Sequence, residues 1–407
     1  MSAADVQIQA LVLVPACAVA APLLADRLGR WLAVPTVVFE IVLGILIGPD
    51  ALGWAGVGGF LDALSEFGLA MLMFLAGYEV DFTRLRGGPL RRAGAAWLLS
   101  LTVALVFGGL LNSDPLNGAF AGLAFTTTAL GTLLPILRDS GVLASPFGSM
   151  TMATGAVGEF GPIVAVAVLL SGNTPFRSAV ILAAFALIAL AALGLARRPQ
   201  PAWVARMIVR TLRTSGQFAV RSVILVLGAM VAAALWLDLD LLLGAFTAGV
   251  VGRLLLAGVP QAEQEVVDAK LEALGFGFLV PVFFVVSGMK FDLTALLHDP
   301  GTLLLVPIFL AGLVVVRGVP AALFAPDLPR RDRAALGLYA ATALPLVVVI
   351  TTIEVDAGHL RTSTAAALVG AGMLSVLLLP LLAQHLRGGT TPAAPPADGP
   401  GARAESW

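Results

Sequence analysis

The sequence predicts an all-α protein that crosses a membrane about thirteen times. The chain of 407 residues is 59% hydrophobic and 12% charged, whereas soluble domains carry about 25% charged residues. Its apolar residues come in runs of roughly 17 to 25, the length that a helix needs to cross the hydrocarbon layer. The alternation of polar and apolar residues that marks a membrane β-strand is not visible.

Short polar clusters separate the apolar runs and set the boundaries of the predicted helices. These helices are expected near residues 7–24, 32–48, 61–80, 93–111, 117–137, 145–170, 176–195, 218–236, 239–256, 271–289, 302–325, 334–354 and 363–384. The tail over 388–407 is rich in Pro, Ala and Gly and is predicted to be disordered and cytoplasmic. We therefore expect one transmembrane domain over 1–387.

Arginine clusters predict how the chain is oriented in the membrane. They follow the first, third, seventh and eleventh predicted helices: Arg27 and Arg30; Arg84, Arg86, Arg91 and Arg92; Arg197, Arg198, Arg206, Arg210 and Arg213; Arg330, Arg331 and Arg333. Positive residues favour the cytoplasmic side. The N-terminus is then outside and the C-terminus inside, and an odd number of helices places the termini on opposite sides in this way. The membrane is expected to be a bacterial inner (cell) membrane.

The arginine-rich segment 196–217 divides the predicted helices into two sets of six. The repeats cover about 7–170 and 218–384, with a linker helix at about 176–195. An odd linker helix gives the two sets opposite orientations, and inverted repeats of this kind are common in secondary transporters.

Several other function classes receive no support. The net charge of −1 does not indicate a nucleic-acid partner, and one cysteine, Cys17, allows no internal disulfide. His298, His359 and His385 lack metal-ligand spacing. No hydrolase or metalloprotease motif is present, so we expect neither an enzyme nor a bound cofactor.

Glu159 is the most informative charged residue. It lies in the middle of the helix predicted at 145–170, between Gly158 and Phe160, with Gly161 and Pro162 following. A charge in hydrocarbon costs at least a few kcal/mol and marks a functional site by default. Glu159 is either a carboxylate that binds a proton and a cation in turn, or a structural carboxylate bonded to a neighbouring helix.

Arg317 is the predicted charge partner of Glu159. It lies inside the helix predicted at 302–325 and stays protonated under ordinary conditions, so it needs an anionic neighbour there. The alternative is an arginine whose side chain reaches the membrane surface.

Two predicted helices look interrupted. The first carries three threonines followed by Gly131 and Pro135, and the second carries Thr342 and Pro345. Proline frees a helical carbonyl, and carbonyl and hydroxyl oxygens suit Na⁺ or K⁺. The three threonines are Thr126, Thr127 and Thr128. A threonine in a membrane helix can instead bond its own backbone.

Three further acids, Glu40, Glu66 and Glu79, lie within or near the ends of the second and third predicted helices. We expect them to serve packing, assembly or the membrane interface.

Four segments resemble monovalent cation:proton antiporter family 2, whose sodium/hydrogen exchanger-like membrane domain occurs in potassium efflux and bacterial sodium/proton antiporters. They are residues 42–49, 66–81, 126–129 and 283–289, in the family's order. The resemblance covers about residues 5–385. It implies two crossed broken helices, a dimerisation domain, a homodimer and elevator-like alternating access.

The resemblance also assigns roles to two residues and shows two departures. Glu159 falls where the family has its ion-binding aspartate, and Arg317 where the family often has a lysine. Gly158 replaces the polar residue that usually precedes the carboxylate, and residues 343–345 replace an Arg-Gly-Glu-like segment. No Gly-rich nucleotide-binding pattern follows the last helix.

The predicted function is electroneutral exchange of Na⁺ or K⁺ for H⁺, because a single carboxylate carries one charge at a time. Glu159 would bind the proton or the cation, the three threonines would add oxygens, and Arg317 would neutralise the empty site. The alternative is a transport-inactive membrane sensor or subunit with a degenerate ion site.

Overall fold

The computed structural model describes residues 3–29, 36–79, 88–111, 115–130, 133, 137, 141–143, 145–169, 175–196, 202–212, 214, 216–237, 239, 241–256, 259–297 and 300–388. Within these residues the regular structure is entirely helical. The predicted all-α class is therefore confirmed for the described chain.

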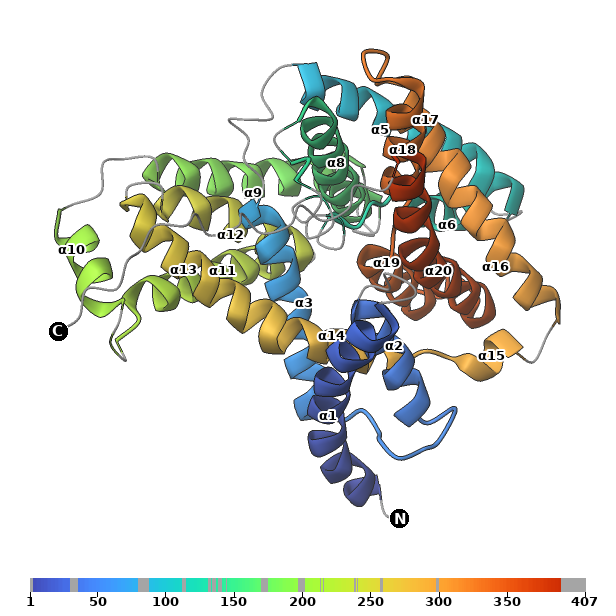
Figure 1. The fold of residues 1–407 in the computed structure, drawn as a ribbon, viewed down its shortest axis with the longest axis horizontal. Coiled ribbons are helices and arrows are strands. Elements are labelled where there is room, and N and C mark those ends of the chain that lie inside the picture. Colours follow the sequence, from blue (N-terminus) through green and yellow to red (C-terminus); the bar gives the residue numbers. More distant parts are fainter. Residues whose placement is uncertain are drawn as a thin grey trace, which may run out of the picture.

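The first half of the chain contributes eight labelled helices up to the arginine-rich segment (Figure 1). They are α1 (Ala3–Gly29), α2 (Thr36–Ile47), α3 (Gly59–Glu79), α5 (Gly88–Leu111), α6 (Pro115–Ala124), α8 (Pro146–Leu169), α9 (Pro175–Ala196) and α10 (Ala202–Thr211).

The second half contains further α-helices and two π-helical segments, η1 and η2. They are α11 (Phe218–Trp236), α12 (Leu241–Leu256), α13 (Gln261–Leu274), η1 (Gly275–Leu279), α14 (Val280–Met289), α15 (Leu293–Leu297), α16 (Pro300–Leu313), η2 (Val314–Gly318), α17 (Val319–Leu323), α18 (Arg330–Ala340), α19 (Pro345–Asp356) and α20 (Thr362–Leu386).

Eight helical segments among the described residues are long and apolar enough to cross a membrane. Three shorter apolar helices, Thr36–Ile47, Ala183–Ala196 and Leu241–Leu256, coincide with further predicted spans. The chain is thus a multi-pass membrane protein. The total of thirteen helices stays a prediction, because parts of the predicted helices lie outside the described residues.

One boundary differs clearly from its prediction. The helix expected to begin near residue 271 begins at Gln261, so the continuous segment covers Gln261–Met289. Its first part is polar and is stabilised by contacts at the molecular surface: the Lys270 ammonium donates to Gln217 Oε1 at 2.8 Å and to the Leu212 carbonyl. Hydropathy marks where a helix enters hydrocarbon and does not detect such a polar extension.

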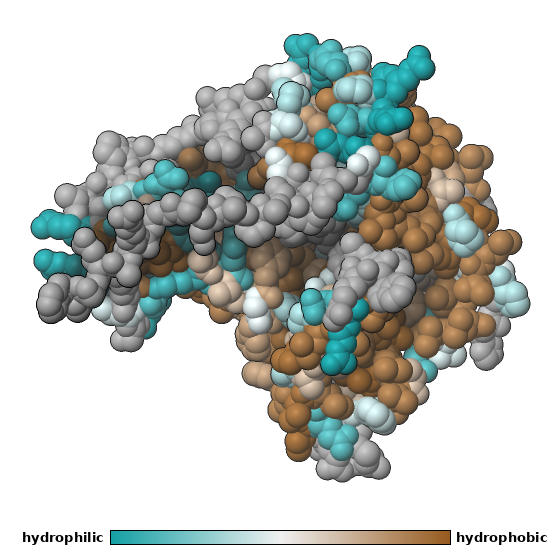
Figure 2. All heavy atoms as spheres, viewed as in Figure 1, coloured by the Kyte–Doolittle hydropathy of each residue, from teal (hydrophilic) through white to brown (hydrophobic). Residues whose placement is uncertain are grey.

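The helices form two groups in Figure 1. One contains α1 to α3 and α9 to α14, and the other contains α5, α6, α8 and α16 to α20. Figure 2 shows hydrophobic residues over the right-hand face around α16, and hydrophilic residues gathered at the top near α17 and α18. An apolar side with polar ends is the surface that a bilayer requires.

Close backbone contacts recur in the first group, and two of them join different helix pairs. A Cβ on Gly77 of α3 would lie 2.1 Å from the Phe246 carbonyl oxygen of α12, and one on Gly288 of α14 would lie 2.2 Å from the Ile41 oxygen of α2. Small residues at membrane helix contacts let backbones approach this closely. The pair α3–α12 therefore packs in the same manner as the pair α2–α14.

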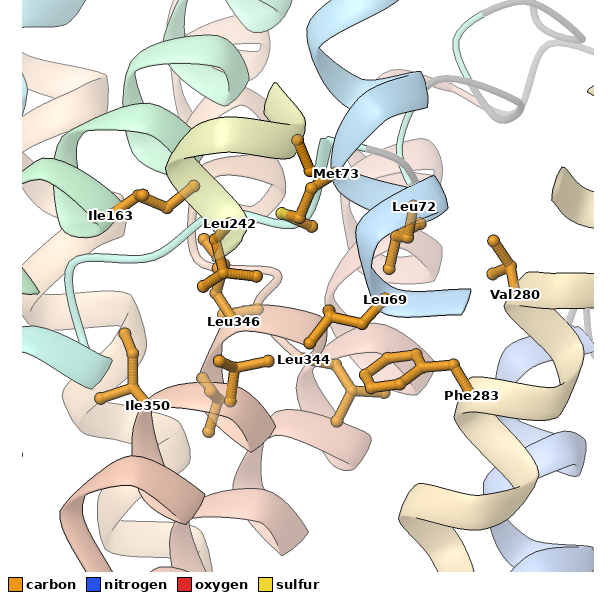
Figure 3. Packing of buried hydrophobic residues seen from close by; sticks show 14 of the residues in the cluster. Leu69, Leu72, Met73, Ile163, Leu242, Val280, Phe283, Leu344, Leu346 and Ile350 are labelled. Atoms are coloured by element: carbon orange, nitrogen blue, oxygen red, sulfur yellow. The ribbon is translucent and has the colours of Figure 1, made fainter. Parts of the chain in front are cut away.

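Apolar side chains make much of the contact between the two groups. Figure 3 shows Leu69 and Met73 of α3 and Phe283 of α14 pointing toward Leu346 and Ile350 of α19, with all five buried in one cluster. The contact between the groups is thus mainly apolar among these described residues.

Candidate functional site

The first interruption follows α6. Residues 125–129 leave the helical conformation, and all five are buried. The Thr126 hydroxyl donates to the Leu123 carbonyl at 2.8 Å, and the Thr127 hydroxyl to the Ala124 carbonyl at 2.9 Å. Both hydroxyls donate their hydrogen to carbonyls of the preceding helical turn. Their oxygen lone pairs remain available as acceptors.

The second interruption separates α18 from α19 at residues 341–344. Pro345 is the first residue of α19, a position where a missing N–H costs nothing. The Thr342 hydroxyl donates to the Leu338 carbonyl at 3.1 Å. The Ser375 hydroxyl of α20 accepts the Ala343 N–H at 2.9 Å and lies 3.0 Å from the Ala343 oxygen. Ser375 was missed from sequence, where it is one serine in an apolar helix.

The two interruptions meet. The Ala129 N–H donates to the Thr342 carbonyl at 2.8 Å, and the Thr128 hydroxyl donates to the Ala340 carbonyl at 2.7 Å. The Thr128 N–H donates to the Gly158 carbonyl at 3.0 Å, so α8 joins the same junction. Gly131 and Pro135, which were expected to shape the first interruption, lie outside the described residues.

Arg317 is fully buried at this junction. Its Nε donates to Thr128 Oγ1 at 2.9 Å and its Nη2 to the Thr154 carbonyl at 2.7 Å, whereas Nη1 has no partner. The residue belongs to the π-helical segment η2. Such single-turn insertions in α-helices often mark functional sites, and hydropathy gave no sign of this one.

Gly158 lies directly against that guanidinium. A Cβ at this position would be 2.4 Å from Thr128 Oγ1 and 2.5 Å from Arg317 Nη2. Arg317 and Thr128 thus occupy the space that a polar side chain at residue 158 would need.

Glu159 is 2% exposed, and its Oε2 has no hydrogen-bond partner. The ion pair expected with Arg317 is not among those that the described residues form; the guanidinium bonds Thr128 and Thr154 instead. Successive helical residues point about 100° apart, so contact with Gly158 does not bring the guanidinium onto the next side chain. Both residues keep one unpartnered buried atom.

Glu79, the last residue of α3, interacts electrostatically with Glu159. It was expected to serve packing, assembly or the membrane interface; its electrostatic interaction with Glu159 adds a link to the candidate site. The sequence could not reveal this proximity, because nothing in α3 or α8 indicates which ends of the two helices meet.

A cavity of about 450 Å³ lies between α3 and α14 on one side and α19 and α20 on the other. Its lining combines apolar residues, several serines and threonines, and the charged residues Glu66, Lys290 and Asp292. Because α19 begins at the junction and its later turns line the cavity, this helix connects the two regions.

The family can now be stated. The model of the transmembrane sodium/hydrogen exchanger family matches residues 15–386. The chain belongs to the sodium/hydrogen exchanger family. The resemblance inferred from four short segments is therefore confirmed.

Individual relatives agree with this membership. YjbQ of Bacillus subtilis is 27% identical over 94% of this chain and 64% of its own length. GerN of Bacillus cereus, named a Na⁺/H⁺–K⁺ antiporter, is 25% identical over 66% of this chain and 67% of its own length. The chain thus spans about two thirds of each of these relatives.

The fold also matches a solved structure. The sodium proton antiporter MjNhaP1 of Methanocaldococcus jannaschii at pH 8 superposes with a TM-score of 0.64 at 16% identity, over 94% of this chain and 97% of that one. At this identity the likeness concerns the fold.

Proposed function

We propose that this chain is a secondary active antiporter that exchanges a monovalent cation, Na⁺ or K⁺, for a proton at Glu159. The observation that carries the proposal is the buried Glu159 carboxylate, with an unpartnered oxygen, beside the junction of two interrupted helices. The family and the printed name of GerN support the substrate class.

Burial explains why the proton and the cation would compete. An ionised carboxylate without a partner costs several kcal/mol in a membrane interior. A bound proton or a bound cation removes that cost, and one site cannot hold both. Glu159 therefore crosses the membrane loaded with one or the other.

The junction supplies further oxygens for a cation. The hydroxyl oxygens of Thr126, Thr127 and Thr128 retain lone pairs, and the interruptions at 125–129 and 341–344 free backbone carbonyls. Hard cations prefer such oxygen ligands.

The charges around the site favour electroneutral exchange. Glu79 adds a second carboxylate to Glu159, and Arg317 adds one positive charge. A single cation or a single proton then neutralises the Glu159 carboxylate. Electroneutral exchange is expected from Glu159 alone, and Glu79 and Arg317, which have opposite charges, leave that expectation unchanged.

We further propose elevator-type alternating access by a homodimer in a bacterial inner membrane, with the N-terminus outside. The two six-helix repeats would be inverted, with α9 as the linker between them. The matching contacts α3–α12 and α2–α14 support such repeats. The mainly apolar contact between the two helix groups suits a surface that slides.

A transport-inactive sensor or subunit is the second candidate. The observation that favours it is Gly158, which supplies no polar side chain beside the carboxylate. Arg317 weakens this candidate, because it fills that space with a polar group from another helix.

Transport by purified protein in proteoliposomes tests the proposal. We expect Na⁺ or K⁺ to drive proton movement in the wild type and the Glu159→Gln variant to lose it. Glu265→Gln, which changes an exposed acid on α13, should behave as the wild type does. Equal transport by the wild type and Glu159→Gln would refute the role of Glu159. No transport by either, with Na⁺, K⁺ or Li⁺, would favour the inactive sensor.

A further inference from the structure

A second buried carboxylate, Glu354, lies near the far end of α19. Its side chain is 1% exposed, and neither of its oxygens has a hydrogen-bond partner. It belongs to none of the groups at the Glu159 site. A buried, unpartnered carboxylate is costly, so its presence requires an explanation of its own.

The turn after α19 brings a histidine onto this carboxylate. Gly358 has a positive φ of 73°, which glycine adopts without strain. The N–H groups of His359 and Leu360 both donate to the Glu354 carbonyl, at 2.9 and 3.1 Å. His359 Nδ1 then lies 3.6 Å from Glu354 Oε2.

The described charged residues around this pair lie on the elements packed against α19 and around the cavity. The helices packed most closely on α19 are α6 and α20, and α3 and α14 face it across the cavity. The described part of α6 contains no titratable residue, and at the near end of α20 the charged neighbour is the exposed Arg361. Glu66, Lys290 and Asp292 line the cavity, to which the neighbours of Glu354 in α19, Ile353 and Val355, contribute.

We propose that Glu354 and His359 form a second proton-binding site, which holds the end of α19 to the turn before α20 and regulates the antiporter. With one proton, the pair is an imidazolium beside a carboxylate, or a neutral acid beside a neutral imidazole. Without it, Glu354 is a buried charge with no partner. Loss of the proton therefore loosens the end of α19.

The effect reaches the ion site through α19 itself. The helix is twelve residues long, from Pro345 to Asp356, and it is preceded by the interruption that bonds Ala129 and Ser375. A change at one end of a short rigid helix tilts or shifts the other end. The regulatory part of this inference rests on the proposed antiport.

Two measurements separate the new site from the transport function. The first is the thermal unfolding temperature of the purified full-length protein at pH 6 and pH 8. We expect the wild type to lose stability between these pH values as the pair loses its proton. Glu354→Gln, which imitates the protonated acid, should lose this component. His359→Gln should change it, because the carboxylate then holds the proton without the imidazole.

The double variant should show no further loss, since coupled residues are not additive. Glu66→Gln, which removes a carboxylate from the same cavity, should keep the wild-type pH dependence. If Glu354→Gln and His359→Gln also keep the wild-type pH dependence of the unfolding temperature, the proton site is refuted. This holds whether or not the protein transports ions. Because His359 is 34% exposed, its variant tests the pair even if Glu354→Gln fails to fold.

The second measurement is the antiport rate in proteoliposomes. The pH is varied only on the side of the membrane nearest Asp356, the last residue of α19. We expect Glu354→Gln to lose the step that the wild type shows between about pH 6 and pH 8. Superimposable profiles would overturn the regulatory role. A wild type that moves no protons would instead contradict the proposed function and leave the stability result to decide the proton site.

Discussion

At the scale of single residues, the site is defined by how closely its side chains pack. Gly158, Thr128 and Arg317 share one space, and only a residue without a side chain at position 158 leaves room for the other two. The arginine then bonds the hydroxyl of Thr128 and the carbonyl of Thr154. The missing polar residue before Glu159 is thus a consequence of how Arg317 is held.

Gly158→Ala tests this close packing. The added Cβ would lie 2.7 Å from Thr128 Cβ, an overpacking that costs about 1–3 kcal/mol. We expect a lower unfolding temperature and strongly reduced antiport. Gly94→Ala is the matched control, because nothing lies within 4 Å of its added Cβ; alanine there should be neutral or stabilising. Equal behaviour of the two variants would contradict the packing described for Arg317.

Glu79→Gln tests the second carboxylate. Removing one negative charge from a partly buried site weakens cation binding by about 1 kcal/mol or more. We expect the apparent KM for the cation to rise about tenfold, in keeping with that energy. Glu66→Gln, in the first half of α3 and away from Glu79, should leave KM near the wild-type value. A wild-type KM in Glu79→Gln would remove Glu79 from the charge balance.

At the scale of elements, the interrupted helices are held by bonds from other helices. Residues 341–344 lack some of the backbone hydrogen bonds of a continuous helix. At Ala343, the hydroxyl of Ser375 in α20 supplies a partner for the backbone instead. The junction also uses the Ala129 N–H and the Thr342 carbonyl. An unpaired backbone group here would cost about 1–3 kcal/mol.

Ser375→Ala removes the replacement partner of Ala343. We expect a fall in unfolding temperature, together with slower antiport, because the second interruption is no longer fixed. Ser287→Ala is the control: that hydroxyl bonds the Phe283 carbonyl within its own helix, so its loss should have a small effect. Equal losses of stability in Ser375→Ala and Ser287→Ala would contradict the role of Ser375 in holding the second interruption.

At the scale of the whole molecule, the sequence predicted what depends on local composition. Apolar runs predicted the spans, and prolines with threonines predicted the neighbourhood of the interruptions, because hydrocarbon and the helical ladder act on each segment separately. The burial of Glu159 and Arg317 follows from the same reasoning.

Contacts between distant segments could not be predicted in this way. The approach of Glu79 to Glu159, the bonds of Ser375 and the pairing of His359 with Glu354 depend on which helices meet and at what height. The π-helical segment that carries Arg317 depends on packing as well. Hydropathy indicates whether a residue lies within the membrane, but it does not indicate which residues of other helices it contacts.

Proton release on cation binding tests the central claim most directly. Purified protein in weakly buffered detergent would receive Na⁺ or K⁺, with choline as the control cation, while a pH indicator counts protons. Competition at Glu159 predicts about one proton released per cation bound by the wild type, and none by Glu159→Gln. Cation binding without proton release, or equal release by the variant, would contradict exchange at this carboxylate.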